Sequence, residues 1–206
     1  MHERRTMLAA VGCALSLSLP SVAAAALVVI DFDDLAAGTV VTDQYADRGV
    51  VFSIDNHATA QAVIIEDIPG SQVNPSSPNA LSNDVDPALM PVQIIRATFV
   101  DPGDGVTPTT TDMVSFRYTS DQPDFGRLEA YSALDQLLAS AVSVEPGFQV
   151  SETLSVSASG IAYVLIHPET DVWVDDFTFS VVPLPAAAWL FVSALAGVLG
   201  LGVVRN

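Results

Sequence analysis

The stretch ETLSVSASGIAYVLIHPETDVWVDDFTFSV, residues 152–181, contains three segments that are typical of β-strands. Each segment, at 152–158, 161–167 and 172–181, is rich in β-branched and aromatic residues and lacks the period of a helix. Only a few residues separate one segment from the next. A parallel connection needs a crossover of about a dozen residues or more, usually a helix, so these strands must be antiparallel to their neighbours.

Seven further segments share this pattern, and they precede the quoted stretch at 27–32, 49–54, 60–66, 91–100, 112–119, 127–133 and 137–144. Runs of Gly, Pro, Asn, Asp and Ser separate them, and only 40–49 could form a helical turn. Ten short strands without crossover helices predict an all-β fold, an antiparallel β-sandwich of the jelly-roll type over residues 27–181. In such a jelly roll we expect the first and last strands to be neighbours.

Alternation along two strands predicts which side chains face the core. In 112–119, Val114, Phe116 and Tyr118 occupy one face, which we expect to be buried. In 172–179, a regular period of two would place Asp175 on the same face as Trp173, Phe177 and Phe179. One carboxylate would then point the same way as three aromatic rings.

The charge of the chain excludes some classes of function. The formal net charge of the whole chain is −17, and residues 27–182 hold 23 acidic residues against four arginines and no lysine. This formal charge of −19 makes nucleic acid an unfavourable partner. Cys13 is the only cysteine, and it lies in a segment that we expect to be removed, which excludes disulfides and cysteine chemistry from the mature protein.

The N-terminus has the features of a secretory signal peptide. Arg4 and Arg5 precede an apolar run at 7–19, and small residues at 23–25 offer an A-x-A cleavage site. We therefore predict a signal peptide over residues 1–26 and export through the Sec machinery.

Acidic residues stand at both ends of the predicted domain. Asp33 follows the first predicted strand, and Asp175 lies in the last one. If those strands are neighbours, Asp33 and Asp175 could bind Ca²⁺, which prefers oxygen ligands. The same residues could instead be turn formers and charges that protect a strand edge. The DPGDG loop at 101–105 lacks the spacing of an EF-hand, so we expect an ordinary turn there.

The chain contains no H-x-x-x-H, H-E-x-x-H or G-x-S-x-G pattern, and nothing singles out a pair of carboxylates for glycoside hydrolysis. A Ser/His/Asp triad assembled from distant residues stays open. We therefore predict no catalytic residues. Sugar-binding sites use flat rings with polar neighbours, and the candidates for such a platform are Tyr45, Phe125, Tyr131 and Trp173. Each of these rings could equally belong to the core.

The C-terminal 25 residues, VPLPAAAWLFVSALAGVLGLGVVRN, resemble the VPLPA variant of the PEP-CTERM sorting signals. The sorting motif would be Val182, Pro183, Leu184, Pro185 and Ala186. A membrane helix over 186–204, about 28 Å long, would follow, with Arg205 on the cytoplasmic side. The resemblance implies processing by an exosortase, although a plain C-terminal membrane anchor is the alternative.

The body of the chain is similar to exported bacterial PEP-CTERM proteins with a galactose-binding-like jelly roll. The similarity lies in blocks such as IDFDDLAAGTVVTDQYADRGVVFS (30–53), SSPNALSND (76–84) and VWVDDFTF (172–179). Carbohydrate-binding modules of that fold often hold a structural Ca²⁺, and the resemblance adds Asn79 to Asp33 and Asp175 as ligands. It implies a non-catalytic protein of the cell surface or extracellular matrix of a Gram-negative bacterium. Its partner would be a polysaccharide, and a secreted hydrolase acting on polysaccharide is the alternative.

Overall fold

The chain folds into an antiparallel arrangement of strands in a computed structural model that describes residues 26–56, 61–66, 76, 78–83, 92–120, 126–144, 150–168 and 172–181. All of these residues belong to one compact unit, Ala24–Pro183. Within them the only helical element is a single 3₁₀ turn, η1 (Ala46–Arg48), which lies inside the segment predicted to hold a helical turn. The prediction of an all-β fold is confirmed.

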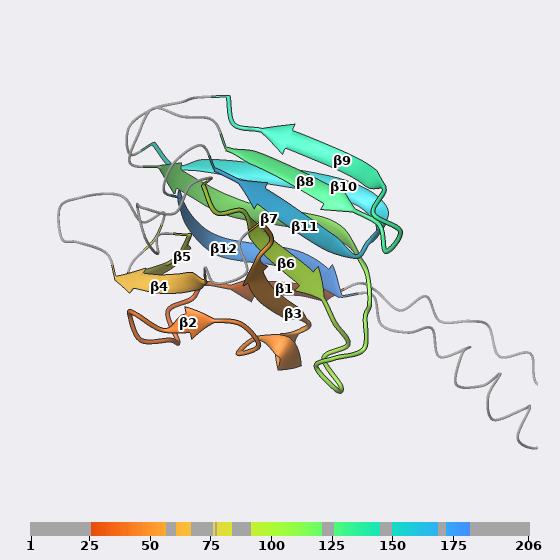
Figure 1. Ribbon diagram of the computed structural model, residues 1–206, viewed down its shortest axis with the longest axis horizontal. Coiled ribbons are helices and arrows are strands. Elements are labelled where there is room, and N and C mark those ends of the chain that lie inside the picture. The colour runs from red at the N-terminus through yellow and green to blue at the C-terminus, as the bar shows by residue number, and fades with distance from the viewer. Residues whose placement is uncertain are drawn as a thin grey trace, which may run out of the picture. The chain divides into compact units, whose positions relative to one another are not determined.

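The strands form two sheets (Figure 1). The seven-stranded sheet has the order β10 (Glu152–Ile161), β7 (Thr111–Ser120), β12 (Val172–Val181), β5 (Asn79–Ser82), β4 (Ala62–Glu66) and β2 (Val40–Val41), and β1 (Ala26–Ile30) also pairs with β12. The five-stranded sheet has the order β3 (Val50–Ile54), β6 (Ile95–Phe99), β11 (Tyr163–His167), β8 (Arg127–Tyr131) and β9 (Leu137–Val142). All ten predicted strands are present, and β2 and β5 are additional.

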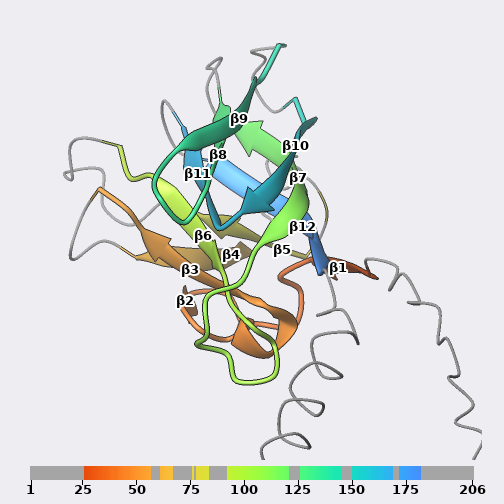
Figure 2. The same cartoon turned by 90° about the vertical axis from the view of Figure 1, so that its right-hand side faces the viewer.

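Aromatic side chains fill the space between the sheets. Phe52 of the five-stranded sheet packs against Phe177 of the other sheet with ring centroids 5.4 Å apart. Phe99 and Phe179 form a second such pair at 5.2 Å. The predicted inner face of β7 is confirmed, because Val114, Phe116 and Tyr118 are all buried. Contacts of this kind join the two sheets into a β-sandwich, whose layers are visible edge-on in Figure 2.

The first and last strands lie side by side, as expected. β1 pairs with the second half of β12, from Ala26 opposite Val181 to Ile30 opposite Phe177. β5 pairs with the first half of β12, with Val174 opposite Leu81. Two strands from distant parts of the chain therefore meet end to end along one edge of β12.

A β-bulge in β12 contradicts the predicted face of its aromatic residues. The pairing of β12 with β7 shifts register between Asp175 and Thr178, and Asp176 has a left-handed backbone with φ of 49°. The extra residue reverses the alternation. Phe177 and Phe179 therefore join the main core, whereas Trp173 packs with Ala80 in a separate small cluster.

Both ends of the chain lie almost wholly outside the described residues. The predicted signal peptide is represented only by its last residue, Ala26, which begins β1. The sorting motif and the predicted membrane helix at 186–204 are not represented. In the part of the chain that the structure describes, no helix is long and apolar enough to cross a membrane.

Candidate functional site

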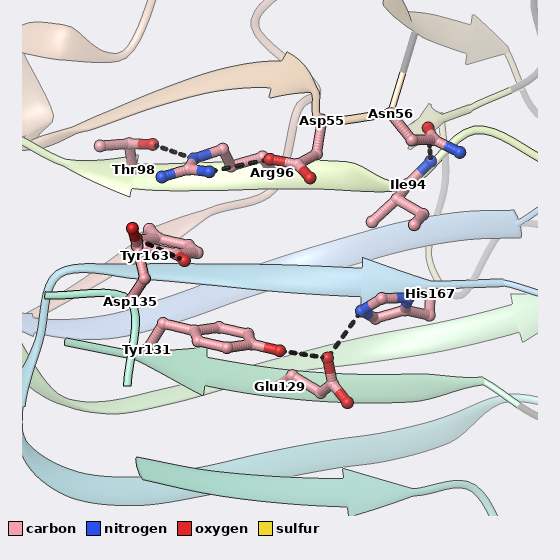
Figure 3. A network of polar contacts seen from close by, with 10 residues as sticks. All are labelled: Asp55, Asn56, Ile94, Arg96, Thr98, Glu129, Tyr131, Asp135, Tyr163 and His167. Carbon is pink, nitrogen blue, oxygen red and sulfur yellow. Dashed lines mark hydrogen bonds and ion pairs between the residues drawn. The ribbon is translucent and has the colours of Figure 1, made fainter. Parts of the chain in front are cut away.

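Polar and aromatic side chains gather on the outer face of the five-stranded sheet, the face turned away from the core (Figure 3). They come from β6, β8 and β11 and from the segments that follow β3 and β8. We call this surface the tyrosine face, and it consists of Asp55, Arg96, Arg127, Glu129, Tyr131, Asp135, Tyr163 and His167.

The alternation of the strands explains why these side chains share a face. Ala97, Ala130 and Val164 point into the core, so the residues on either side of them point outward. The register then pairs Tyr131 of β8 with Tyr163 of β11. Beneath and beside the polar groups, Ile94, Ala162 and Leu165 pack with the two tyrosines as a small apolar cluster.

Three planar groups form a stack across the strands. The rings of Tyr131 and Tyr163 are nearly parallel, with centroids 5.0 Å apart and an interplanar angle of 8°. The guanidinium carbon of Arg96 lies 3.6 Å from the centroid of Tyr163, a cation–π contact. Tyr163 is thus covered on both sides and is only 7% exposed. Tyr131 is the last planar group of the stack, on the side of β9.

Glu129 is the polar centre of the tyrosine face. Its Oε2 accepts a hydrogen bond of 2.7 Å from the hydroxyl of Tyr131 and lies 2.9 Å from Nε2 of His167. Its Oε1 lies 3.2 Å from Nε of Arg127. The hydrogen bond to Glu129, with a contribution from burial, raises the pKa of Tyr131 to about 12. Burial lowers the pKa of His167 despite the neighbouring carboxylate.

A second set of contacts fixes the other end of the stack. Arg96 donates from Nη1 to Asp55 over 2.8 Å and from Nε to the hydroxyl oxygen of Thr98 over 3.2 Å. Tyr163 donates its hydroxyl proton to Asp135 over 3.0 Å, and burial raises its pKa. Each planar group of the stack is therefore held by at least one carboxylate.

The chemistry of the tyrosine face suits recognition of a polar ring. A sugar presents C–H groups on its flat sides and hydroxyl groups around its rim. An aromatic ring can pack against the first, and carboxylates and guanidinium groups can hydrogen bond to the second. Two of the four arginines of the domain lie here although the domain as a whole is strongly acidic.

The predicted metal ligands lie at a different place, where β1 and β5 meet along β12. Oδ1 of Asp33 accepts a hydrogen bond of 3.0 Å from the backbone of Asn79, and the side chain of Asn79 donates to the carbonyl of Leu35 over 2.8 Å. The structure therefore brings Asp33 into contact with the backbone of Asn79.

Asp175 lies on the neighbouring strand and is fully buried. Its Oδ2 accepts hydrogen bonds from the backbone and hydroxyl of Ser76, and its Oδ1 accepts one of 2.7 Å from the backbone of Asp176. Burial raises the pKa of Asp175 to about 6.

Among the described residues, no hydrogen bond joins Asp175 to Asp33 or Asn79. Over the same part of the chain, no group of three or more His, Cys, Asp or Glu side chains is placed to hold a metal. The predicted set consists of two carboxylates and one amide, so it does not contain three side chains of those four residue types. Its donor chemistry, oxygen atoms from Asp and Asn side chains, fits Ca²⁺.

The DPGDG segment forms the turn that was expected. Asp101 accepts a hydrogen bond from the backbone of Gly103, and Asp104 accepts from Val106 and Thr107. These hydrogen bonds, chiefly those from Thr107, lower the pKa of Asp104.

The four candidate platform rings have different locations. Tyr45 is buried in the core, and its hydroxyl donates to Asp34 over 2.6 Å. Trp173 is 9% exposed and therefore has no open ring face, and Phe125 lies outside the described residues. Among the three described rings, Tyr131 is the one that is not buried, and it lies beside charged side chains on an outer sheet face. Arg96 and Tyr163 were not predicted, because the register that brings them to Tyr131 has no local signal in the sequence.

Comparison with known proteins identifies no family for the chain. No protein-family model matches, and no curated protein matches. Among solved structures, the carbohydrate-binding module TmCBM61 in complex with beta-1,4-galactotriose is similar over 63% of this chain and 87% of its own, with a TM-score of 0.40 and 14% identity.

Two further structures show the same level of similarity. The K1 cleaved adhesin domain of Lys-gingipain from Porphyromonas gingivalis W83 has a TM-score of 0.47 and 10% identity, over 75% of this chain and 97% of its own. A family 6 carbohydrate-binding module has a TM-score of 0.35 and 14% identity, over 69% of this chain and 93% of its own. At this level, none of these similarities identifies a ligand for this chain.

Proposed function

We propose that this protein is an exported, non-catalytic protein of the bacterial cell surface or extracellular matrix that binds polysaccharide through its tyrosine face. The observation that supports this function is the stack of Arg96, Tyr163 and Tyr131, which ends at Tyr131 and is surrounded by hydrogen-bonding side chains. The five-stranded sheet of the β-sandwich supplies the surface on which the face is built.

Within the tyrosine face, Tyr131 is the residue that would contact the sugar ring. Tyr163 cannot do so because Arg96 and Tyr131 cover its two sides. The hydrogen bond from Tyr131 to Glu129 fixes the ring before any ligand arrives, which lowers the conformational entropy lost on binding.

The state of the carboxylates favours binding over hydrolysis. A glycoside hydrolase needs two carboxyl groups free to exchange protons with substrate and water. On the tyrosine face Glu129, Asp55 and Asp135 each accept a hydrogen bond or ion pair from a side chain that belongs to the same face. They are therefore engaged in positioning the planar groups.

Export and sorting are the second part of the proposal, supported by the sequence of the two ends. The Sec machinery would export the chain, and residues 1–26 would be removed as a signal peptide. The helix at 186–204 would hold the protein in the inner membrane of a Gram-negative bacterium. An exosortase would then act at Val182, Pro183, Leu184, Pro185 and Ala186 and release the protein to the cell surface.

A structural Ca²⁺ is the third part of the proposal. Asp33, Asn79 and Asp175 would hold it at the meeting point of β1, β5 and β12. The burial of Asp175 supports this assignment, because a bound cation would offset the cost of an ionised carboxylate away from water.

A glycan array and a polysaccharide hydrolysis screen, both carried out on the full chain in mild detergent, test the proposed function. We expect binding to at least one glycan without release of reducing ends. Tyr131→Ala should weaken binding at least tenfold. Met113→Ala is the matched control, since Met113 lies half-buried on the outer face of the other sheet, and it should bind normally.

Two results would contradict the proposed function. Equal binding by Tyr131→Ala and Met113→Ala would move the ligand away from the tyrosine face. Release of reducing ends from the bound glycan would identify the protein as a hydrolase. Circular dichroism of both variants shows whether each is folded.

A further inference from the structure

The strand β9 forms one margin of the five-stranded sheet and exposes apolar side chains. Among the described residues it pairs only with β8, so its other edge has no strand partner there (Figure 1). Leu137, Leu138 and Val142 are 54%, 36% and 51% exposed. Exposed, uncharged edge strands are templates for pairing with another chain.

The neighbouring margin of the molecule is built differently. Figures 1 and 2 place β10, an edge strand of the other sheet, beside β9. The exposed side chains in the middle of β10 are Thr153, Ser155 and Ser157, all polar. The apolar surface is therefore a property of β9 and not of every strand edge in this protein.

The distribution of charge decides which partner suits β9. Residues 136–144, QLLASAVSV, contain no charged side chain, whereas residues 27–182 have a formal charge of −19. Two copies of so acidic a protein repel each other over most orientations. Contact through 136–144 brings together two segments that carry no charged side chain of their own.

The side chains of β9 are also self-complementary. Leu138, Ser140 and Val142 are exposed on one face of the strand, and Ala139 and Ala141 pack against the core on the other. Antiparallel pairing about Ser140 places Leu138 opposite the partner's Val142, and Val142 opposite the partner's Leu138. The same apolar contact is thus formed twice by the twofold symmetry.

We propose that β9 is a homodimer interface, at which a second copy of the chain pairs antiparallel through the edge of β9 with Ser140 on the twofold axis. The two five-stranded sheets would then form one continuous sheet. Because the axis is perpendicular to that sheet, the two tyrosine faces would lie on the same side of it.

Cysteine cross-linking of the full chain in mild detergent tests this interface. In a Cys13→Ser background, Ser140→Cys places two thiols next to each other at the proposed axis. Ser155→Cys, at an exposed position on β10, is the matched control. With a short bifunctional thiol reagent, we expect a covalent dimer for Ser140→Cys and at least tenfold less for Ser155→Cys. The yield should rise with added NaCl, because salt screens the repulsion between the acidic copies.

Charge variants provide the second measurement. Val142→Glu adds a like charge on each side of the interface and should reduce the dimer fraction measured by light scattering at least tenfold. Thr153→Glu adds the same charge to β10 and should leave the dimer fraction unchanged. Equal cross-linking at positions 140 and 155, which association through the C-terminal segment would produce, overturns the proposal. If the protein is monomeric at all salt concentrations, the proposal is also overturned, and a partner at the edge of β9 would have to be a different molecule.

Discussion

At the scale of single residues, Glu129 links the aromatic stack to the charged groups of the tyrosine face. Its two oxygens contact the hydroxyl of Tyr131, the imidazole of His167 and the guanidinium of Arg127. Only 13% of its side chain is exposed, so these partners replace most of the water that an isolated carboxylate would bind. Glu129 is therefore a positioning residue for Tyr131.

His167 should make the stability of the protein depend on pH. Burial lowers its pKa from the ordinary value of 6.5. As the pH falls through 6.5, the imidazole of the unfolded chain gains a proton before that of the folded chain does. The unfolded state then binds more protons, so the free energy of unfolding decreases on acidification. We expect His167→Gln to remove this part of the decrease.

Denaturant unfolding of both proteins at pH 7.5 and pH 5.5 checks the role of His167. Between pH 7.5 and pH 5.5, the free energy of unfolding of the wild type should decrease more than that of His167→Gln. Glu129 and Arg127, which both contact His167, are present in wild type and variant. A difference that is the same at both pH values would contradict the assignment.

At the scale of elements, the bulge in β12 decides where several side chains lie. Without it, Asp175 would point into the aromatic core with Phe177 and Phe179. With it, Asp175 contacts Ser76 while the two phenylalanines fill the space between the sheets. The left-handed backbone of Asp176 is the local cause.

Asp176→Val should destabilise the bulge. A β-branched side chain is strained at φ of 49°, and we expect a loss of roughly 1–3 kcal/mol in the free energy of unfolding. Asp176→Asn is the matched control, because Asn tolerates this backbone but also loses the ion pair with Arg117. That exposed pair contributes less than about 1 kcal/mol. Equal losses for the two variants in denaturant unfolding would show that the backbone is not strained.

The sequence predicts the long strands of this fold well and the short ones poorly. Each of the ten predicted strands has a run of β-branched, aromatic or alternating residues, and all ten are present. β2 has two residues, and β5, with the sequence NALS, lacks β-branched and aromatic residues. Pairing with β4 and β12 determines β5, and no local pattern could show this.

The candidate site was predictable only in part, for the same physical reason. Tyr131 was a candidate from its residue type, but Arg96 and Tyr163 reach it through strand register between segments far apart in the chain. The faces of β12 were predicted wrongly because Asp175 and Asp176 give no sequence signal of an extra residue.

At the scale of the whole molecule, the fold must hold together a strongly acidic chain. The ends of the described domain are joined by the pairing of β1 with β12. Asp33 follows β1, and Asp175 lies in β12 just before the segment that pairs with it. A cation bound between them would reduce the repulsion among these acidic residues and hold the first and last strands together.

We expect millimolar Ca²⁺ to raise the melting temperature of the full chain and a chelator to reverse the effect. An ion that binds only the folded state adds roughly 2.7 kcal/mol to the free energy of unfolding at a hundredfold excess over Kd. Differential scanning fluorimetry with NaCl at matched ionic strength separates this specific effect from screening of the charge.

Two variants locate the ion. Asp175→Asn should abolish the Ca²⁺-dependent rise in melting temperature, since it removes one of the two carboxylates. Asp104→Asn is the matched control, because Asp104 belongs to the other acidic loop considered for Ca²⁺ and there accepts only turn hydrogen bonds. If Asp175→Asn retains the full rise and Asp104→Asn loses it, the ion binds at 101–105. It could not then join the first and last strands, and their association would depend on strand pairing and core packing alone.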